Sequence, residues 1–100
     1  MPVRVVFTAA ARDEAIAAQD WYAERSVELG RRFRRALDRA VFGVAQNPLR
    51  FPVVWRDRVR RALVLDRFPY ALYFTVDGEQ VTVIACFHAS RDPRRWQERA

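Results

Sequence analysis

Apolar positions change their spacing along this chain, and each spacing predicts a different kind of element. A short apolar stretch at residues 3–7 predicts a first β-strand. Over residues 9 to about 25, and again over roughly 27–46, apolar residues recur every three to four positions, as on one face of a helix. The first part of the chain is therefore predicted to be a strand followed by two helices.

The ends of both helices carry suitable capping signals. Thr8 is a fair N-cap for the first helix, and Pro48 disfavours the helical conformation of Asn47 and so ends the second. The second helix has the clearest stripe, which includes Leu29, Phe33 and Leu37. Because the join between the two helices is short, the pattern predicts an antiparallel helical hairpin.

After Pro48 the apolar period falls to two residues, which is typical of strands. Three strands are predicted, at 59–66, 70–76 and 80–87, the last two joined by a turn around Gly78. Asp92 and Pro93 resemble the start of a short helical tail that contains Trp96. The prediction is an α+β fold of order β-α-α-β-β-β, with a helical hairpin packed on a small antiparallel sheet and a short C-terminal helical tail.

Length and composition narrow the class of protein. One hundred residues suit one domain, spanning residues 1–100, and 51% hydrophobic residues can form its core. Cys86 and His88 are the only residues of their types, so we expect no disulfide framework, no metal site and no cofactor. No apolar run is long enough to span a membrane, and the opening is too short for a signal peptide, so a cytoplasmic location is expected.

Charge is the first feature that suggests a partner. The chain carries 18 arginines and no lysine against 12 acidic residues, a net charge of +6. Arginine binds phosphates and carboxylates through two-pronged contacts, so an anionic partner is plausible. On the second helix, however, Glu28 and Asp38 can pair with neighbouring arginines at helical spacing, which is typical of an ordinary solvated surface.

The segment 55–69 is more basic than the rest of the chain. Its five arginines meet only Asp57 and Asp66, which leaves +3 over fifteen residues. On a strand, Arg60 and Arg61 would point to opposite faces. The segment is either a cationic surface for phosphodiester backbone or acidic protein, or an edge strand that its charges protect from aggregation.

His88 is the one side chain that titrates near neutral pH, and it closes the last strand on the same face as Cys86. It could serve as acid or base in phosphodiester cleavage, with arginines holding the developing charge. That chemistry also needs a second base, and Asp57 and Asp66 qualify only if the sheet order brings them near. A strand-end histidine with a purely structural role is the alternative, and Cys86 is most simply a core residue.

Several short motifs together resemble one family. They are Ala18-x-x-Trp21-Tyr22, Leu29-Gly30-x-x-Phe33, Asn47-Pro48 with Phe51-Pro52, Val59-Arg60-Arg61, Phe68-Pro69-Tyr70-x-Leu72-x-Phe74 and His88-x-x-Arg91-Asp92-Pro93-x-x-Trp96. In order and spacing the chain resembles the ParE branch of the RelE/ParE toxin superfamily. That fold, a helical hairpin against a small antiparallel sheet, agrees with the periodicity.

The resemblance implies a type II toxin, a growth inhibitor kept silent by a cognate antitoxin protein in a hetero-oligomer. Apolar surface around Trp21, Tyr22 and Phe33 would then bind the antitoxin. ParE-like members act on DNA gyrase, whereas RelE-like members cut mRNA in the ribosome with a cluster of Lys, Arg and a C-terminal Tyr or His. This chain has no lysine and no tyrosine after Tyr73, which favours the ParE-like branch.

Three hypotheses follow. The preferred one is a ParE-like inhibitor of DNA gyrase whose target surface comprises Arg60, Arg61, Arg67, His88, Arg91, Asp92 and Trp96, the last two fixing the tail. The second is a ribosome-dependent endoribonuclease, with His88 and Arg61 as catalytic residues and with Arg60 and Arg67 also holding the phosphate. The third is a small nucleic-acid-binding module without toxicity.

Overall fold

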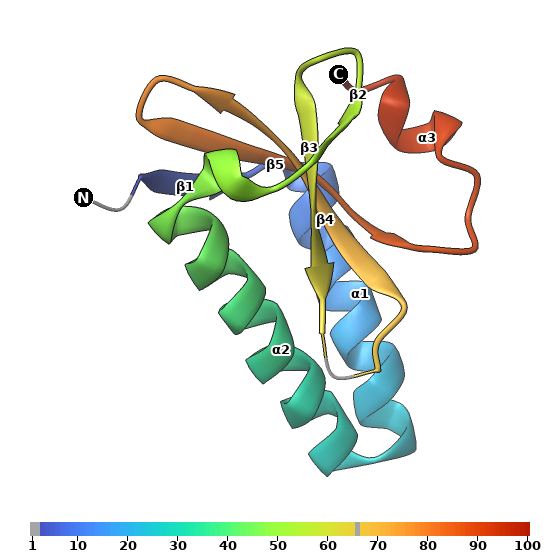
Figure 1. Ribbon diagram of the computed structural model, residues 1–100. Helices are drawn as coiled ribbons and strands as arrows, with labels where there is room; N and C mark the ends of the chain where they lie inside the picture. Colours follow the sequence, from blue (N-terminus) through green and yellow to red (C-terminus); the bar gives the residue numbers. More distant parts are fainter. Residues whose placement is uncertain (1–2, 66) are drawn as a thin grey trace.

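The computed structural model describes residues 3–65 and 67–100; Asp66, considered above as a partner for His88, lies outside the described residues. A five-stranded sheet carries two long helices on one face and a short third helix on the other (Figure 1). In chain order the elements are β1 (Arg4–Phe7), α1 (Ala9–Arg25), α2 (Val27–Gln46), the 3-10 helix η1 (Pro48–Arg50), β2 (Val53–Trp55), β3 (Val59–Val64), β4 (Tyr70–Asp77), β5 (Gln80–His88) and α3 (Arg94–Gln97).

Ser26 is the single residue that connects the two helices of the hairpin. The Ser26 amide donates to the Tyr22 carbonyl at the end of α1, and the Ser26 hydroxyl accepts from the Leu29 amide at the start of α2. Gly30 lies where the two helices approach closely, because a Cβ built there would be 2.7 Å from the Ala23 Cβ. Both helix predictions are confirmed within the described residues.

The strand order is β1-β5-β4-β3-β2, and neighbouring strands from β5 to β2 are antiparallel. The predicted α+β class and element order are confirmed. The sheet is mixed rather than wholly antiparallel, because β1 runs parallel to β5 with Phe7 opposite Val83. The structure also adds β2, whose three residues are too few to show a recognisable alternation.

A β-bulge on β5 decides which way its last residues face. Tyr73 pairs with Ala85 and Phe74 with Val83, so Ile84 is an extra residue on the bulged strand. Val83 before the bulge and Cys86 after it both enter the core beneath the helices. His88, two residues beyond Cys86, therefore lies on the helix face as well.

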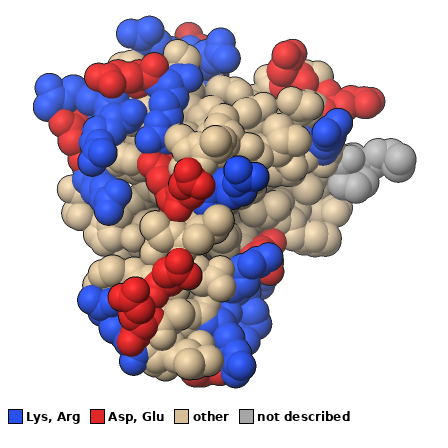
Figure 2. Space-filling model, turned by 180° about the vertical axis from the view of Figure 1, so that it is seen from behind, with Lys and Arg blue, Asp and Glu red and all other residues tan. Residues whose placement is uncertain are grey.

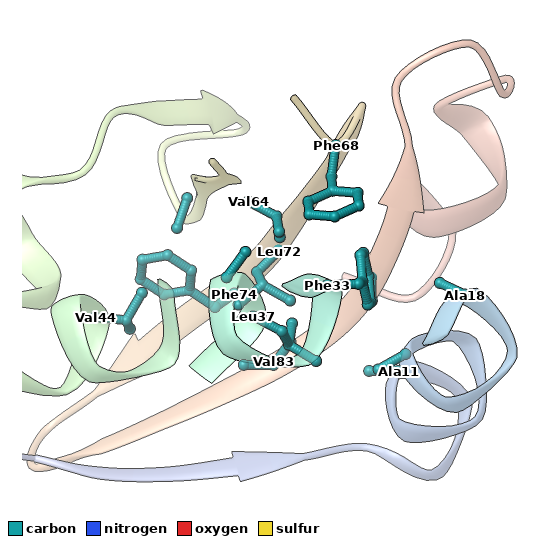
Figure 3. Close-up of a cluster of buried hydrophobic side chains, with 14 of the residues drawn as sticks. Ala11, Ala18, Phe33, Leu37, Val44, Val64, Phe68, Leu72, Phe74 and Val83 are labelled. Atoms are coloured by element: carbon teal, nitrogen blue, oxygen red, sulfur yellow. The ribbon is translucent and has the colours of Figure 1, made fainter. Parts of the chain in front are cut away.

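Buried side chains form two clusters, one on each face of the sheet. The larger cluster, between the sheet and the helical hairpin, contains Phe33, Leu72 and Phe74, each fully buried (Figure 3). The smaller one lies on the opposite face, called here the open face, where Trp96 of α3 packs with Val59 and Phe87. The two clusters fix the sheet between α1 and α2 on one side and the C-terminal tail on the other.

Candidate functional site

The adjacent arginines Arg60 and Arg61 point to opposite faces of β3, as predicted. Arg60 shares its face with Ala62 and Val64, and its Nη1 donates to the carbonyl oxygens of Leu49 (3.1 Å) and Phe51 (2.6 Å). Its guanidinium therefore holds the η1 turn against the sheet. Arg60, one of the residues predicted to contact the target, is thus partly buried and has two hydrogen bonds within the chain.

Arg61 and Arg67 come together on the open face. They line a groove of about 280 Å³ whose wall includes Leu63, Ala71 and Tyr73. Burial raises the pKa of Tyr73, while the Arg61 guanidinium, which hydrogen-bonds the phenol, acts in the opposite direction. Neither arginine forms an ion pair with any residue that the structure describes. This open-face groove therefore presents two accessible cations beside an aromatic ring.

Arg67 has an unusual backbone conformation for its residue type. It lies in the left-handed region with φ of 71° in the connection between β3 and β4. A non-glycine residue there is strained and is held by its surroundings. Arg67 lines the open-face groove in this conformation.

The C-terminal tail packs against Tyr73, one of the residues that line this groove. Trp96 is 3% exposed and stacks on Tyr73 with ring centroids 4.1 Å apart. Asp92 accepts from the amide and guanidinium of Arg94, and these hydrogen bonds lower the pKa of its carboxyl group. Asp92 thus holds the start of α3, and Trp96 packs α3 onto the sheet. Because Trp96 is buried, it supports the surface from below and is not itself exposed to a partner.

His88 lies away from the open-face groove, on the helix face. It lines a second groove of about 500 Å³, called here the helix-side groove, with Trp21, Tyr70 and Arg91. The His88 Nδ1 is engaged by the amide and hydroxyl of Ser90, and the ring packs edge-on against Tyr70. The sheet therefore separates His88 from Arg61, and the arrangement predicted for a nuclease is not assembled in this structure.

The three residues predicted to bind an antitoxin have very different exposure. Trp21 is 50% exposed and carries the Arg25 guanidinium 3.2 Å above its ring, and Tyr22 is half-buried beside it. Phe33 is fully buried and stacks with Tyr22, so it belongs to the core and cannot contact a partner. Phe33 belongs to the apolar stripe of α2, and that stripe faces the sheet.

Cys86 is a core residue. Its side chain is buried, and burial together with the nearby Glu14 carboxylate raises the pKa of the thiol to about 12. The thiolate needed for a nucleophile or a metal ligand is therefore scarce at neutral pH. Among the described residues no group of three or more metal-ligating side chains occurs, and no helix there is long and apolar enough to span a membrane.

The structure adds residues that sequence analysis did not single out. Leu63 and Tyr73 line the open-face groove with the two arginines, because Arg61 is directly opposite Tyr73 in the β3–β4 register. Only the cross-strand register brings them together. On the face shown in Figure 2, acidic side chains lie among the basic ones, and that face carries no single continuous basic field.

Comparison with known proteins identifies the family. The family model described as the ParE toxin of the type II toxin-antitoxin system parDE matches residues 5–93. This chain therefore belongs to the ParE toxin family. A solved structure described as the chromosomal ParDE TA system from P. aeruginosa has a similar fold, with a TM-score of 0.68 at 18% identity over 88% of this chain and 97% of that one. No curated protein sequence matches this chain significantly.

Proposed function

We propose that this chain is the toxin of a two-protein module, that it inhibits DNA gyrase in the cytoplasm by binding, and that a cognate antitoxin neutralises it. The observation that carries this proposal is the match of residues 5–93 to the parDE toxin family. The unpaired cations of the open-face groove support a binding mode, since they suit an acidic protein surface or a phosphate backbone.

Arg61 and Arg67 are the residues proposed to contact the target. They are accessible, share one groove and have no ion-pair partner in the described part of the chain. Charged contacts at an interface mainly steer association and fix orientation. Removing both charges is therefore expected to weaken inhibition without unfolding the protein.

A supercoiling assay with purified gyrase tests the proposal. The wild-type chain should inhibit supercoiling or trap cleaved DNA, and the double variant R61Q/R67Q should need about tenfold more protein for the same effect. The control R34Q removes an exposed arginine that pairs with Asp38 on α2, and it should behave like the wild type. Gyrase that is unaffected by the wild-type chain would exclude the proposed target.

The endoribonuclease hypothesis has weaker support, because His88 and Arg61 face opposite sides of the sheet. Mapping new 5′ ends on ribosome-bound mRNA after expression tests it directly. Cuts that appear with the wild type and disappear with H88A would replace the gyrase proposal. A small module that binds nucleic acid without harm would instead show salt-dependent DNA binding and unimpaired growth.

A further inference from the structure

The helix-side groove lies between α1 and the paired ends of β4 and β5. Its volume of about 500 Å³ is typical of a site for one small molecule. Two lines of residues, each with one residue per helical turn, form its α1 wall: Asp13, Ala17 and Trp21, and beside them Glu14, Ala18 and Tyr22. Because the two alanines are small, they leave open space between an acidic end and an aromatic end.

The aromatic end of the groove gathers hydrogen-bond donors. The ring centroid of Tyr70 lies 6.3 Å from that of Tyr22 and 5.2 Å from that of His88. Burial raises the pKa of both phenols, so each keeps its proton at neutral pH. Neither hydroxyl has a hydrogen-bond partner in the part of the chain that the structure describes. Both are therefore available to donate to a ligand.

His88 adds two donors at the same end. Its Nδ1 accepts from the Ser90 amide at 3.0 Å, so the neutral ring carries its proton on Nε2. Its own amide points to the same side of β5 as the Cys86 amide, which donates to Glu14, because the two sides alternate along a strand. Since β1 pairs with β5 only as far as Val83, no strand of the described chain covers the His88 amide.

The two ends of the groove differ in charge. The Glu14 carboxylate is already paired with Arg99, with Oε2 2.8 Å from Nη2. Asp13, at the acidic end, and Arg91, at the aromatic end, have no ion-pair partner among the described residues. The groove therefore suits a molecule with an anionic group at one end and N–H donors at the other.

Trp21 indicates what joins those two ends. Its ring lines the groove and is 50% exposed, and an exposed indole favours stacking with a flat ring. We propose that the helix-side groove binds a free nucleoside monophosphate whose base carries an amino group. The phosphate accepts from Tyr70, His88 and Arg91, as arginine and clustered donors suit it. The base stacks on Trp21, and its amino group donates to Asp13. This site is separate from the open-face groove, and the inference does not depend on gyrase.

Calorimetric titration of the purified full-length protein with GMP tests the inference. GMP should bind at one site per chain. Guanosine lacks the phosphate and ribose 5-phosphate lacks the base, so each should bind at least about tenfold more weakly. Inosine monophosphate keeps the phosphate and a flat base but lacks the amino group, and it should also bind about tenfold more weakly.

Substitutions at the aromatic end localise the phosphate. Y70F removes one hydroxyl from the groove and should weaken GMP binding about tenfold. Its matched control, Y73F, removes a hydroxyl on the open face and should bind GMP as the wild type does. R91Q should weaken binding to a similar extent, whereas R34Q removes an arginine that pairs with Asp38 on α2 and should have no effect.

A substitution at the acidic end tests the contact with the base. D13A should abolish the preference for GMP over inosine monophosphate and leave the affinity for inosine monophosphate unchanged. Thermal unfolding verifies that each variant is folded. The comparison of the four ligands on the wild-type chain decides the inference even where a variant fails to fold.

The remaining outcomes overturn the inference. They are the absence of GMP binding, equal binding of guanosine or ribose 5-phosphate, equal losses in Y70F and Y73F, and a preference for GMP that survives in D13A. Tighter binding of a 5′-phosphorylated tetranucleotide than of GMP would also overturn it, because the groove would then hold the end of a nucleic acid. GMP binding without gyrase inhibition would contradict only the proposed function.

Discussion

The Arg99 guanidinium and the Glu14 carboxylate, 85 positions apart, form an ion pair at 2.8 Å that fastens the C-terminus to α1. The same carboxylate accepts from the Cys86 amide, and the Arg99 Nη1 donates to the Ile84 carbonyl. Since β1 pairs with β5 only as far as Val83, these two side chains serve backbone groups on the edge of β5 beyond the end of β1. The pair thus completes the sheet and holds the tail across its edge.

Removing Glu14 should therefore loosen the tail as well as destabilise the fold. E14A leaves the Arg99 guanidinium without its carboxylate partner and the Cys86 amide without its acceptor, where the side chains of Glu14 and Arg99 are mostly buried. The free energy of unfolding should fall by about 2 kcal/mol. Urea unfolding measures the loss, and limited proteolysis should cut the variant faster after residue 90.

A double-mutant cycle is the control for that pair. E14A and R99A should each lower the free energy of unfolding. The double variant should lower it by clearly less than the sum of the two single losses, because each single change already breaks the shared contact. Additive losses would mean that the two residues do not act as a pair.

The two glycines of α2 should respond oppositely to alanine. G30A places a methyl group 2.7 Å from the Ala23 Cβ and 2.9 Å from its Cα, which forces the helices apart, so unfolding should become easier by about 1–3 kcal/mol. In G43A the added methyl group meets the end of the Arg50 side chain at 3.3 Å, which can move, and the Phe51 Cζ at 3.7 Å, an ordinary contact. Because alanine favours helix, G43A should be neutral or stabilising by up to about 1 kcal/mol in urea unfolding. Equal losses in both variants would contradict the close approach at Gly30.

Substitutions of the two neighbouring arginines of β3 should differ in their effect on stability. R60M removes the donor to the Leu49 and Phe51 carbonyls and should lower the free energy of unfolding by about 1–3 kcal/mol. R61M keeps the aliphatic part of a side chain on the open face, and it should change the free energy of unfolding by no more than about 1 kcal/mol. Urea unfolding of both variants checks this, and a larger loss for R61M than for R60M would reverse the two roles.

Cys86 should make the fold sensitive to alkali. Its thiol pKa is raised to about 12 in the folded state from an ordinary value of 9.0, so the unfolded chain loses this proton first as the pH rises. The folded state then holds more protons, and stability falls between those two values by up to about 1.4 kcal/mol per pH unit from this group. Below pH 9 the contribution is fully present. C86A should show a shallower alkaline loss in urea unfolding at several pH values.

The same protonation state predicts low reactivity. At pH 8 iodoacetamide should modify the native thiol far more slowly than the thiol of the urea-unfolded chain, because Cys86 is buried and protonated. Rapid alkylation of the native protein would show that the cysteine is accessible.

Local patterns alone were enough to place most elements of this protein. The stripe through Phe33 and Leu37 marked α2, Pro48 marked its end, and Gly78, at φ 60°, lies in the predicted turn between β4 and β5. These features depend on residues close together in sequence, where periodicity, capping and backbone preference act. The opposite directions of Arg60 and Arg61 follow from the same local alternation.

Tertiary structure decided which candidates share a surface. Val81 and Val83 face the helices, so unbroken alternation along β5 would have placed His88 on the other face of the sheet, with Arg61. The extra residue Ile84 shifts the alternation and returns His88 to the helix face. Whether Arg60 is exposed depended on carbonyls nine and eleven residues away, and whether Leu63 is covered depended on where β2 ends. Such pairing and packing bring together segments that are far apart in the sequence. Composition and spacing therefore indicated a basic protein with arginines on its strands, but they did not show which of those arginines are accessible to a partner.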